Sequence, residues 1–245
     1  MWHDAAKGCL INSKMDKKVD IYTAVSEVKD GHTIMVGGFG VPGTPFRLIE
    51  VLLEQGTRHL TLIKNEANIP QLGVSRLIEA GRVDRLITSH LGLNPSVLAM
   101  MNDKKIEVEF NPQGILAERI RCGGAGMLGF VTDIGIDTVL SRGKKIVSLN
   151  GRKGVLESAL RADVALIHAA VGDGLGNLVY AKSARNFNPA MATAADKVIA
   201  EVESLVDAGS LDPDHVHTPG AFVDHVAEID TLTDEYGILE DYIFG

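Results

Sequence analysis

Cysteines, basic residues and long apolar runs are all scarce in this sequence. Two of its 245 residues are cysteines, Cys9 and Cys122, and their spacing is not that of a metal or redox site. This cysteine content fits a reducing compartment, so we expect the protein in the cytoplasm. No apolar run approaches the ~18–20 residues that span a membrane, and we therefore expect no membrane partner.

Charge argues against a second class of partner. The chain has 24 Lys and Arg residues against 32 Asp and Glu residues, which gives a formal net charge of −8. A nucleic-acid-binding protein needs a basic face to neutralise phosphates, and no basic run is present. The sequence therefore predicts no nucleic-acid partner.

The two ends of the chain differ from its middle. Residues 1–14 have no apolar segment of the signal-peptide type and precede an ordinary start at Met15, so we expect a leader or disordered arm there. After about Asp230 the sequence becomes acidic and loses periodicity, and we expect residues 230–245 to form an acidic tail. Between them, residues 15–229 have no change in composition that would divide them, which indicates one domain.

What the sequence does contain is an alternation of two patterns. Apolar runs of four to eight residues end in glycine or polar turns and are followed by segments of helical period. The expected strands are Thr33–Val36, His59–Ile63, Val83–Ser89, Ile106–Phe110, Lys145–Leu149, Val155–Ser158, Val164–Ala169, Leu178–Ala181 and Val198–Val202. The expected helices are Phe46–Glu54, Gln71–Glu79, Pro95–Asn102, Ile115–Arg121 and Pro189–Ala195.

This alternation predicts an α/β fold with an open, mostly parallel sheet and helices on both faces. Ligands of such folds bind beyond the carboxyl ends of the strands. One antiparallel hairpin is also expected, because Asn150-Gly151 is a type I′ turn signal, with residues 152–154 lengthening its loop.

Glycine is enriched: 26 residues, about 11 % of the chain where roughly 7 % is usual. The densest group follows the first expected strand, in the segment from Gly37 to Gly43. Thr44 is placed to cap the next helix, with Pro45 at its first position. Glycines let backbone amides approach a ligand, and a helix N-terminus favours negative charge, so the loop can hold a pyrophosphate or an acyl-transfer oxyanion. A tight strand-to-helix turn without a ligand is the alternative.

A nicotinamide-binding loop fits this segment poorly. Gly38, Gly40 and Gly43 have the Gly-x-Gly-x-x-Gly spacing, but the required acidic residue should end the next strand. That strand ends in Lys64-Asn65, with Glu66 slightly late.

The same segment, from Asp30 to Pro45, resembles in full a signature of the family I coenzyme A transferases: Asp-Gly, two free positions, three apolar residues, Gly-Gly-Phe, three free positions, Gly, any residue, Pro. Further stretches resemble the α (A) subunit of this family, closest to its acetate/acetoacetate (3-oxoacid) branch. They are Asn111–Gly114, Leu116–Arg121, Gly123–Gly126, Ala184–Pro189 and His217–Gly220. Together these motifs run from about residue 20 to residue 228.

The resemblance implies a CoA-transferase/isomerase-like fold and a defined chemistry. Such enzymes move coenzyme A between a short-chain acyl-CoA (acetyl-, acetoacetyl-, butyryl- or succinyl-CoA) and a free carboxylate, by a ping-pong route through a glutamyl-CoA thioester. In two-subunit members the glutamate lies in a Ser-Glu-Asn-Gly motif of the β (B) subunit, and this chain has no such motif. The implied partner is a β subunit in an α2β2 or larger assembly, with coenzyme A as a substrate and neither a permanently bound cofactor nor a metal.

The resemblance also implies site residues. The loop formed by Gly37, Gly38, Phe39, Gly40, Val41, Pro42 and Gly43 resembles the coenzyme A-contacting loop. Asn65 and Gln113 are the expected substrate-pocket residues. Glu66 is an alternative nucleophile on this chain, although it lacks a following Asn-Gly and stands where the family's α subunits carry an Asn-rich turn. The alternative for Phe39 is a side chain buried in the core.

Other candidates are better explained structurally. Arg185 and Asn186 have two interpretations. They order the substrate loop or the subunit contact, or they belong to a buried turn with no functional role. His215 and His217 have no third ligand nearby and are expected on a surface loop. His90 and His168 are expected to be hydrogen-bonded strand histidines, Cys122 a small core residue, and Gly172–Gly176 a turn. Ser183 lacks the context of a hydrolase nucleophile.

Two other functions remain open at this point. One is a ligand-sensing protein without catalysis on the same fold, and the other is a sugar-phosphate isomerase-like enzyme, although no phosphate-clamping cluster of Lys and Arg is visible.

Overall fold

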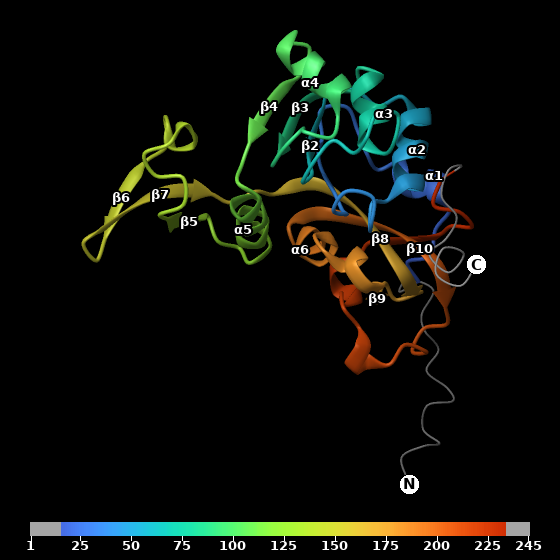
Figure 1. Ribbon diagram of the computed structural model, residues 1–245. Coiled ribbons are helices and arrows are strands. Elements are labelled where there is room, and N and C mark those ends of the chain that lie inside the picture. The colour runs from blue at the N-terminus through green and yellow to red at the C-terminus, as the bar shows by residue number, and fades with distance from the viewer. Residues whose placement is uncertain (1–15, 234–245) are drawn as a thin grey trace.

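The computed structural model describes residues 16–233. The predicted leader at 1–14 and residues 234–245 of the predicted acidic tail lie outside this part. Its main feature is an eight-stranded sheet (Figure 1). The strands lie in the order β11 (His225–Glu228), β10 (Ala195–Val206), β8 (Ala162–Asp173), β1 (Thr33–Val36), β2 (Leu60–Ile63), β3 (Val83–Thr88) and β4 (Glu107–Phe110), all parallel, with β9 (Leu178–Val179) antiparallel to β8.

Helices cover both faces of this sheet. Successive strand residues point to opposite faces, so Ile34 and Val36 of β1 join one apolar core and Met35 joins the other. The first core lies under α1 (Ile21–Val25), α2 (Phe46–Gln55), α3 (Val74–Glu79) and α4 (Pro95–Asn102), and the second under α5 (Gln113–Gly124) and α6 (Asn188–Thr193). The predicted open, mostly parallel α/β sheet with helices on both faces is confirmed.

A second, three-stranded antiparallel sheet was not predicted as a separate unit. It has the order β5 (Gly129–Thr132), β7 (Arg152–Ser158) and β6 (Ile146–Leu149), and it extends away from the main body (Figure 1). The expected longer hairpin loop is wrong, because Leu149 pairs with Arg152 and only Asn150-Gly151 form the turn. Their φ angles of 51° and 76° are those that a type I′ turn requires, so β7 can begin at once.

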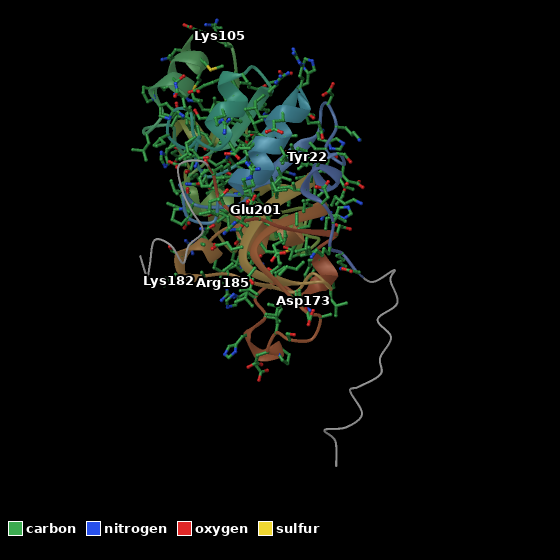
Figure 2. All side chains as sticks on the ribbon, turned by 90° about the vertical axis from the view of Figure 1, so that its right-hand side faces the viewer. Tyr22, Lys105, Asp173, Lys182, Arg185 and Glu201 are labelled. Carbon is green, nitrogen blue, oxygen red and sulfur yellow. The ribbon has the colours of Figure 1, made fainter. Side chains whose placement is uncertain are left out.

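A buried ionic group ties the middle strands to α2. His168 on β8 lies between two carboxylates of β10: Nδ1 is 3.0 Å from Glu201 Oε1, and Nε2 is 3.0 Å from Glu203 Oε1. The other oxygen of Glu201, labelled in Figure 2, accepts a hydrogen bond from the Leu48 N–H in the first turn of α2 at 2.9 Å. Although burial opposes the charge of His168, the two carboxylates raise its pKa to about 9. This histidine is the hydrogen-bonded strand residue that the sequence predicts.

Between residues 16 and 233, none of the helices combines the length and the apolar character needed to cross a lipid bilayer.

Candidate active site

The predicted site residues gather where parallel strands end. Strands β1 to β4 run side by side in one direction, so the loops that follow them emerge at one edge of the sheet. The glycine loop, residues 37–43, follows β1. Residues 64–68 follow β2, His90 lies in the loop after β3, and Gln113 begins α5 just after β4.

The glycines of the loop are required by its backbone and its neighbours. Gly38, Gly40 and Gly43 have φ angles of 94°, 63° and 76°, a backbone region that residues other than glycine rarely adopt. Gly37 has an ordinary φ, but a Cβ there would lie 1.8 Å from Asn188 Oδ1. The conformation of the loop and its close contact with Asn188 therefore both require glycine.

Residues after β9 support one side of the loop. Asn188 Nδ2 donates to the Gly43 carbonyl at 3.0 Å, and Asn186 Nδ2 donates to the Pro42 carbonyl at 2.9 Å. The Phe39 ring stacks on Phe187 with centroids 6.4 Å apart, yet Phe39 remains 49 % exposed, so its alternative position in the core is wrong.

The 3-10 helix η3 (Lys182–Arg185) lies just before these residues. It carries the exposed side chains of Lys182 and Arg185, which are labelled close together in Figure 2.

A fully buried lysine at the end of β2 supports the glycine loop. Lys64 Nζ donates to the Gly37 carbonyl at 2.8 Å and to Thr44 Oγ1 at 2.9 Å, and Thr44 Oγ1 donates to the Gly40 carbonyl at 2.7 Å. Burial lowers the pKa of Lys64 to about 7, although the nearby Glu66 carboxylate favours its charged form. The sequence offered one signal for this role, a lysine that directly continues an apolar strand.

The prediction that Thr44 caps α2 is wrong. The helix begins at Phe46, Pro45 occupies the N-cap position, and no side chain caps it. The Thr44 hydroxyl is instead engaged by Gly40 and Lys64, because the loop turns back on itself before the helix starts.

Asn65 contributes a buried donor with nothing to bind. Its Oδ1 accepts a long hydrogen bond of 3.4 Å from the Gly40 N–H, and its main-chain carbonyl is held by Ser89. Its Nδ2 is buried and has no partner among the described residues. Buried polar atoms are nearly always hydrogen-bonded, so an unpaired amide beside a glycine loop marks a place for a ligand acceptor.

Glu66 faces the same part of the loop. It is 5 % exposed, and its Oε1 lies 3.4 Å from the position that a Cβ on Gly40 would take. Its Oε2 is 3.7 Å from His90 Nε2, and within residues 16–233 its carboxylate accepts no hydrogen bond. Asn68 completes this turn, since its Nδ2 donates to the Gly40 carbonyl at 2.8 Å.

Gln113 stands at the same edge but farther along the sheet. It is partly exposed and begins α5, which runs back to pack against α6. The turn before it is fixed by Arg119, whose Nη1 donates to Asn111 Oδ1 at 2.7 Å and pairs with Glu109. The structure therefore brings Asn65, Glu66 and the glycine loop into contact, with Gln113 on the flank.

The weaker candidates take structural positions. His217 Nδ1 accepts from the Tyr180 N–H at 2.9 Å, and His215 pairs with Asp212 at the surface. Cys122 is fully buried. No three His, Cys, Asp or Glu side chains in the described part of the chain gather as a metal ion would require.

The candidate site lies at the edge of the sheet where β1 to β4 end, and two hollows lie elsewhere. A hollow of about 430 Å³ lies between α2 and α3, and one of about 320 Å³ lies on the small sheet. Neither is lined by Asn65, Glu66 or the glycine loop. Large apolar side chains are exposed around the edge, one at or after the end of each of β1 to β4: Phe39, Ile69, Leu93 and Phe110.

Comparison with known proteins gives consistent results. A sequence model of the coenzyme A transferase family matches residues 18–228. The chain is 50 % identical over 210 residues to the alpha subunit of the acetate CoA-transferase of Escherichia coli K12, covering 86 % of this chain and 96 % of that one. It is 42 % identical over 207 residues to the corresponding subunit of the succinyl-CoA:3-ketoacid coenzyme A transferase of Helicobacter pylori, covering 84 % of this chain and 89 % of that one.

A solved structure shares the fold. The acyl-CoA transferase of Escherichia coli O157:H7, in a thioester complex with CoA, superposes with a TM-score of 0.80 at 24 % identity. The match covers 88 % of this chain and 48 % of that one, so the present chain spans about half the length of that protein.

Proposed function

Since the chain belongs to the coenzyme A transferase family, we propose that it is the α subunit of an enzyme that transfers coenzyme A from a short-chain acyl-CoA to a free carboxylate. Its similarity to subunits of acetate and of succinyl-CoA:3-ketoacid transferases supports a short aliphatic acid as substrate. Coenzyme A is then a substrate that enters and leaves, and the enzyme acts as an α2β2 or larger assembly.

The observation that carries this proposal is the buried, unpaired Nδ2 of Asn65 beside the glycine loop. Attack on a thioester carbonyl moves negative charge onto its oxygen, and a donor aimed at that oxygen stabilises the transition state. Asn65 Nδ2 supplies such a donor without breaking a bond already made in the protein. In the glycine loop the N–H groups of Gly37, Phe39 and Gly40 are bonded within the chain, and those of Gly38, Val41 and Gly43 make no hydrogen bond with residues 16–233, so they are available as further donors.

The nucleophile in this proposal comes from the β subunit. A glutamate of that subunit forms a bond to the acyl-CoA carbonyl carbon, the thiolate of coenzyme A leaves, and an acyl-glutamyl anhydride forms. The thiolate then attacks the glutamyl carbonyl carbon, which releases the first carboxylate and leaves a glutamyl-CoA thioester. A second carboxylate reverses these steps and takes the coenzyme A.

Exposed apolar side chains at the edge where β1 to β4 end support a partner protein at this position. Phe39, Ile69, Leu93 and Phe110 are exposed at or after the ends of the four strands, and a surface with several large exposed apolar groups supports a partner protein. The solved acyl-CoA transferase chain is about twice as long as the aligned part of this one, which agrees with a second half being needed.

Mixing the subunits tests the proposal. The partner is the product of a neighbouring reading frame that encodes Ser-Glu-Asn-Gly, and the measurement is coenzyme A exchange between acetyl-CoA and a panel of short acids. We expect exchange after mixing and none with either chain alone. An assembled complex that transfers coenzyme A to no acid in the panel would refute the proposed function.

A further inference from the structure

Glu66 is a carboxylate inside the site with no protein donor of its own. It is 5 % exposed, accepts no hydrogen bond from residues 16–233, and its Oε2 lies 3.7 Å from His90 Nε2. A buried carboxylate is normally paired or hydrogen-bonded, so the acceptor oxygens of this one are left for whatever occupies the site.

Glu66 also lies within reach of a ligand bound at Asn65. Both side chains meet the same residue of the loop, since Asn65 Oδ1 accepts from the Gly40 N–H at 3.4 Å and Glu66 Oε1 lies 3.4 Å from a Cβ built on Gly40. A short acyl chain whose carbonyl oxygen is bound by Asn65 Nδ2 would therefore lie beside the same loop residue as the Glu66 carboxylate.

Two of the basic side chains near the strand ends, Lys64 and Arg119, are engaged by protein groups. Lys64 lies beneath the loop, where its Nζ is held by the Gly37 carbonyl and Thr44 Oγ1. The guanidinium of Arg119 is bound by Glu109, Asn111 and the Ser158 carbonyl. All the hydrogen bonds that these two side chains make go to protein groups, so neither is seen to bind a second negative charge on the substrate.

We propose that Glu66 is a specificity-determining residue, which admits acids with an uncharged chain and rejects dicarboxylates. This inference rests on the proposed function and adds the substrate class, short monocarboxylates. Two like charges a few ångströms apart in a partly desolvated site repel strongly enough to discriminate by about 10- to 100-fold.

Butyrate and succinate form a matched pair of acceptors for the test. Both have four carbons, and they differ in a methyl group against a second carboxylate. With the assembled α and β subunits and acetyl-CoA as donor, we expect kcat/KM to be about 10- to 100-fold higher for butyrate than for succinate. A wild-type complex that uses succinate as well as butyrate overturns the proposal without any variant.

Variants then locate the effect. Glu66→Gln should raise kcat/KM for succinate and reduce the preference for butyrate by about 10-fold or more, whereas Glu66→Asp keeps the charge and should keep the preference. Glu54→Gln, which removes a carboxylate from the exposed side of α2, should leave the preference unchanged. The subunit ratio and the melting temperature of each complex report on assembly.

Two variant results would contradict this role. If Glu66→Gln leaves the ratio of the two acids unchanged, Glu66 does not select between them. If it abolishes transfer to both acids in a correctly assembled complex, Glu66 acts in catalysis or loop support. Both results differ from failure of the proposed function, in which even the wild-type complex transfers coenzyme A to no acid.

Discussion

Asn65 and Lys64 are neighbours in sequence with opposite roles in the geometry of the site. Asn65 has an unpaired donor, Nδ2, beside the glycine loop, whereas Lys64 donates its hydrogen bonds to the Gly37 carbonyl and Thr44 Oγ1. Asn65 was expected from its place after a strand. Lys64 was not, because a lysine at a strand end is normally an exposed residue, and only the packing of the loop above it shows that it is buried.

Replacing Asn65 by Ala should reduce turnover more than stability. The Nδ2 atom has no partner in the described part of the chain, so under the proposed function its loss removes a hydrogen bond to the reacting oxygen. We expect kcat/KM of the assembled enzyme to fall by about 10²- to 10³-fold. The melting temperature should fall modestly, because the substitution also removes the Oδ1 atom that accepts from the Gly40 N–H. A variant with wild-type kcat/KM would show that Asn65 does not contact the reacting group.

Replacing Lys64 by Met should change how stability depends on pH. The pKa of Lys64 is about 7 in the folded chain, against 10.5 for an ordinary lysine. Between these values the unfolded chain holds a proton that the folded chain has released, so this group makes the free energy of unfolding rise with pH.

Denaturant titrations of both proteins measure this effect. The free energy of unfolding of the wild type, minus that of Lys64→Met, should increase by about 1.4 kcal/mol per pH unit between about pH 7.5 and 9.5. Parallel stability profiles for the two proteins would contradict a lowered pKa for this amine.

At the scale of elements, the glycine loop depends on close contact with the residues that flank it. Gly37→Ala would place a Cβ 1.8 Å from Asn188 Oδ1, which must then move away from the loop. We expect a loss of about 1–3 kcal/mol in the free energy of unfolding, measured by chemical denaturation. Gly114→Ala is the matched control, because nothing lies within 4 Å of a Cβ there. Since Gly114 lies in α5, alanine should raise the free energy of unfolding by up to about 1 kcal/mol. Equal effects of the two substitutions would refute the tight packing of Gly37.

Elements with strong apolar patterns could be predicted from the sequence, and elements without them could not. Strand β1 and helix α4 have the predicted bounds, because a continuous apolar run and an Asn-Pro start are strong local signals. Helix α1 has five residues, and strand β11 (His-Val-Ala-Glu) is held mainly by its parallel pairing with β10. Their formation depends on distant partners, which a local pattern does not contain.

At the scale of the whole molecule, residues 16–233 form an eight-stranded sheet with the candidate site at the edge where β1 to β4 end. The loop, the buried amide of Asn65 and the Glu66 carboxylate all lie on this chain, and apolar side chains surround them. The sequence predicted the position of the edge, since parallel strands place their ends together. It did not predict the small antiparallel sheet of β5, β6 and β7 as a separate unit, because that sheet leaves apolar residues such as Leu149 exposed and its pattern resembles that of ordinary core strands.

The central claim is that this chain contributes the binding surface and its partner the nucleophile. The most direct measurement is the intact mass of each subunit once the assembled enzyme has been incubated with acyl-CoA in the absence of an acceptor acid. We predict that the mass of the β subunit increases by bound coenzyme A with loss of water, while the mass of this chain is unchanged. Coenzyme A attached to this chain, at Glu66 or elsewhere, would contradict the account.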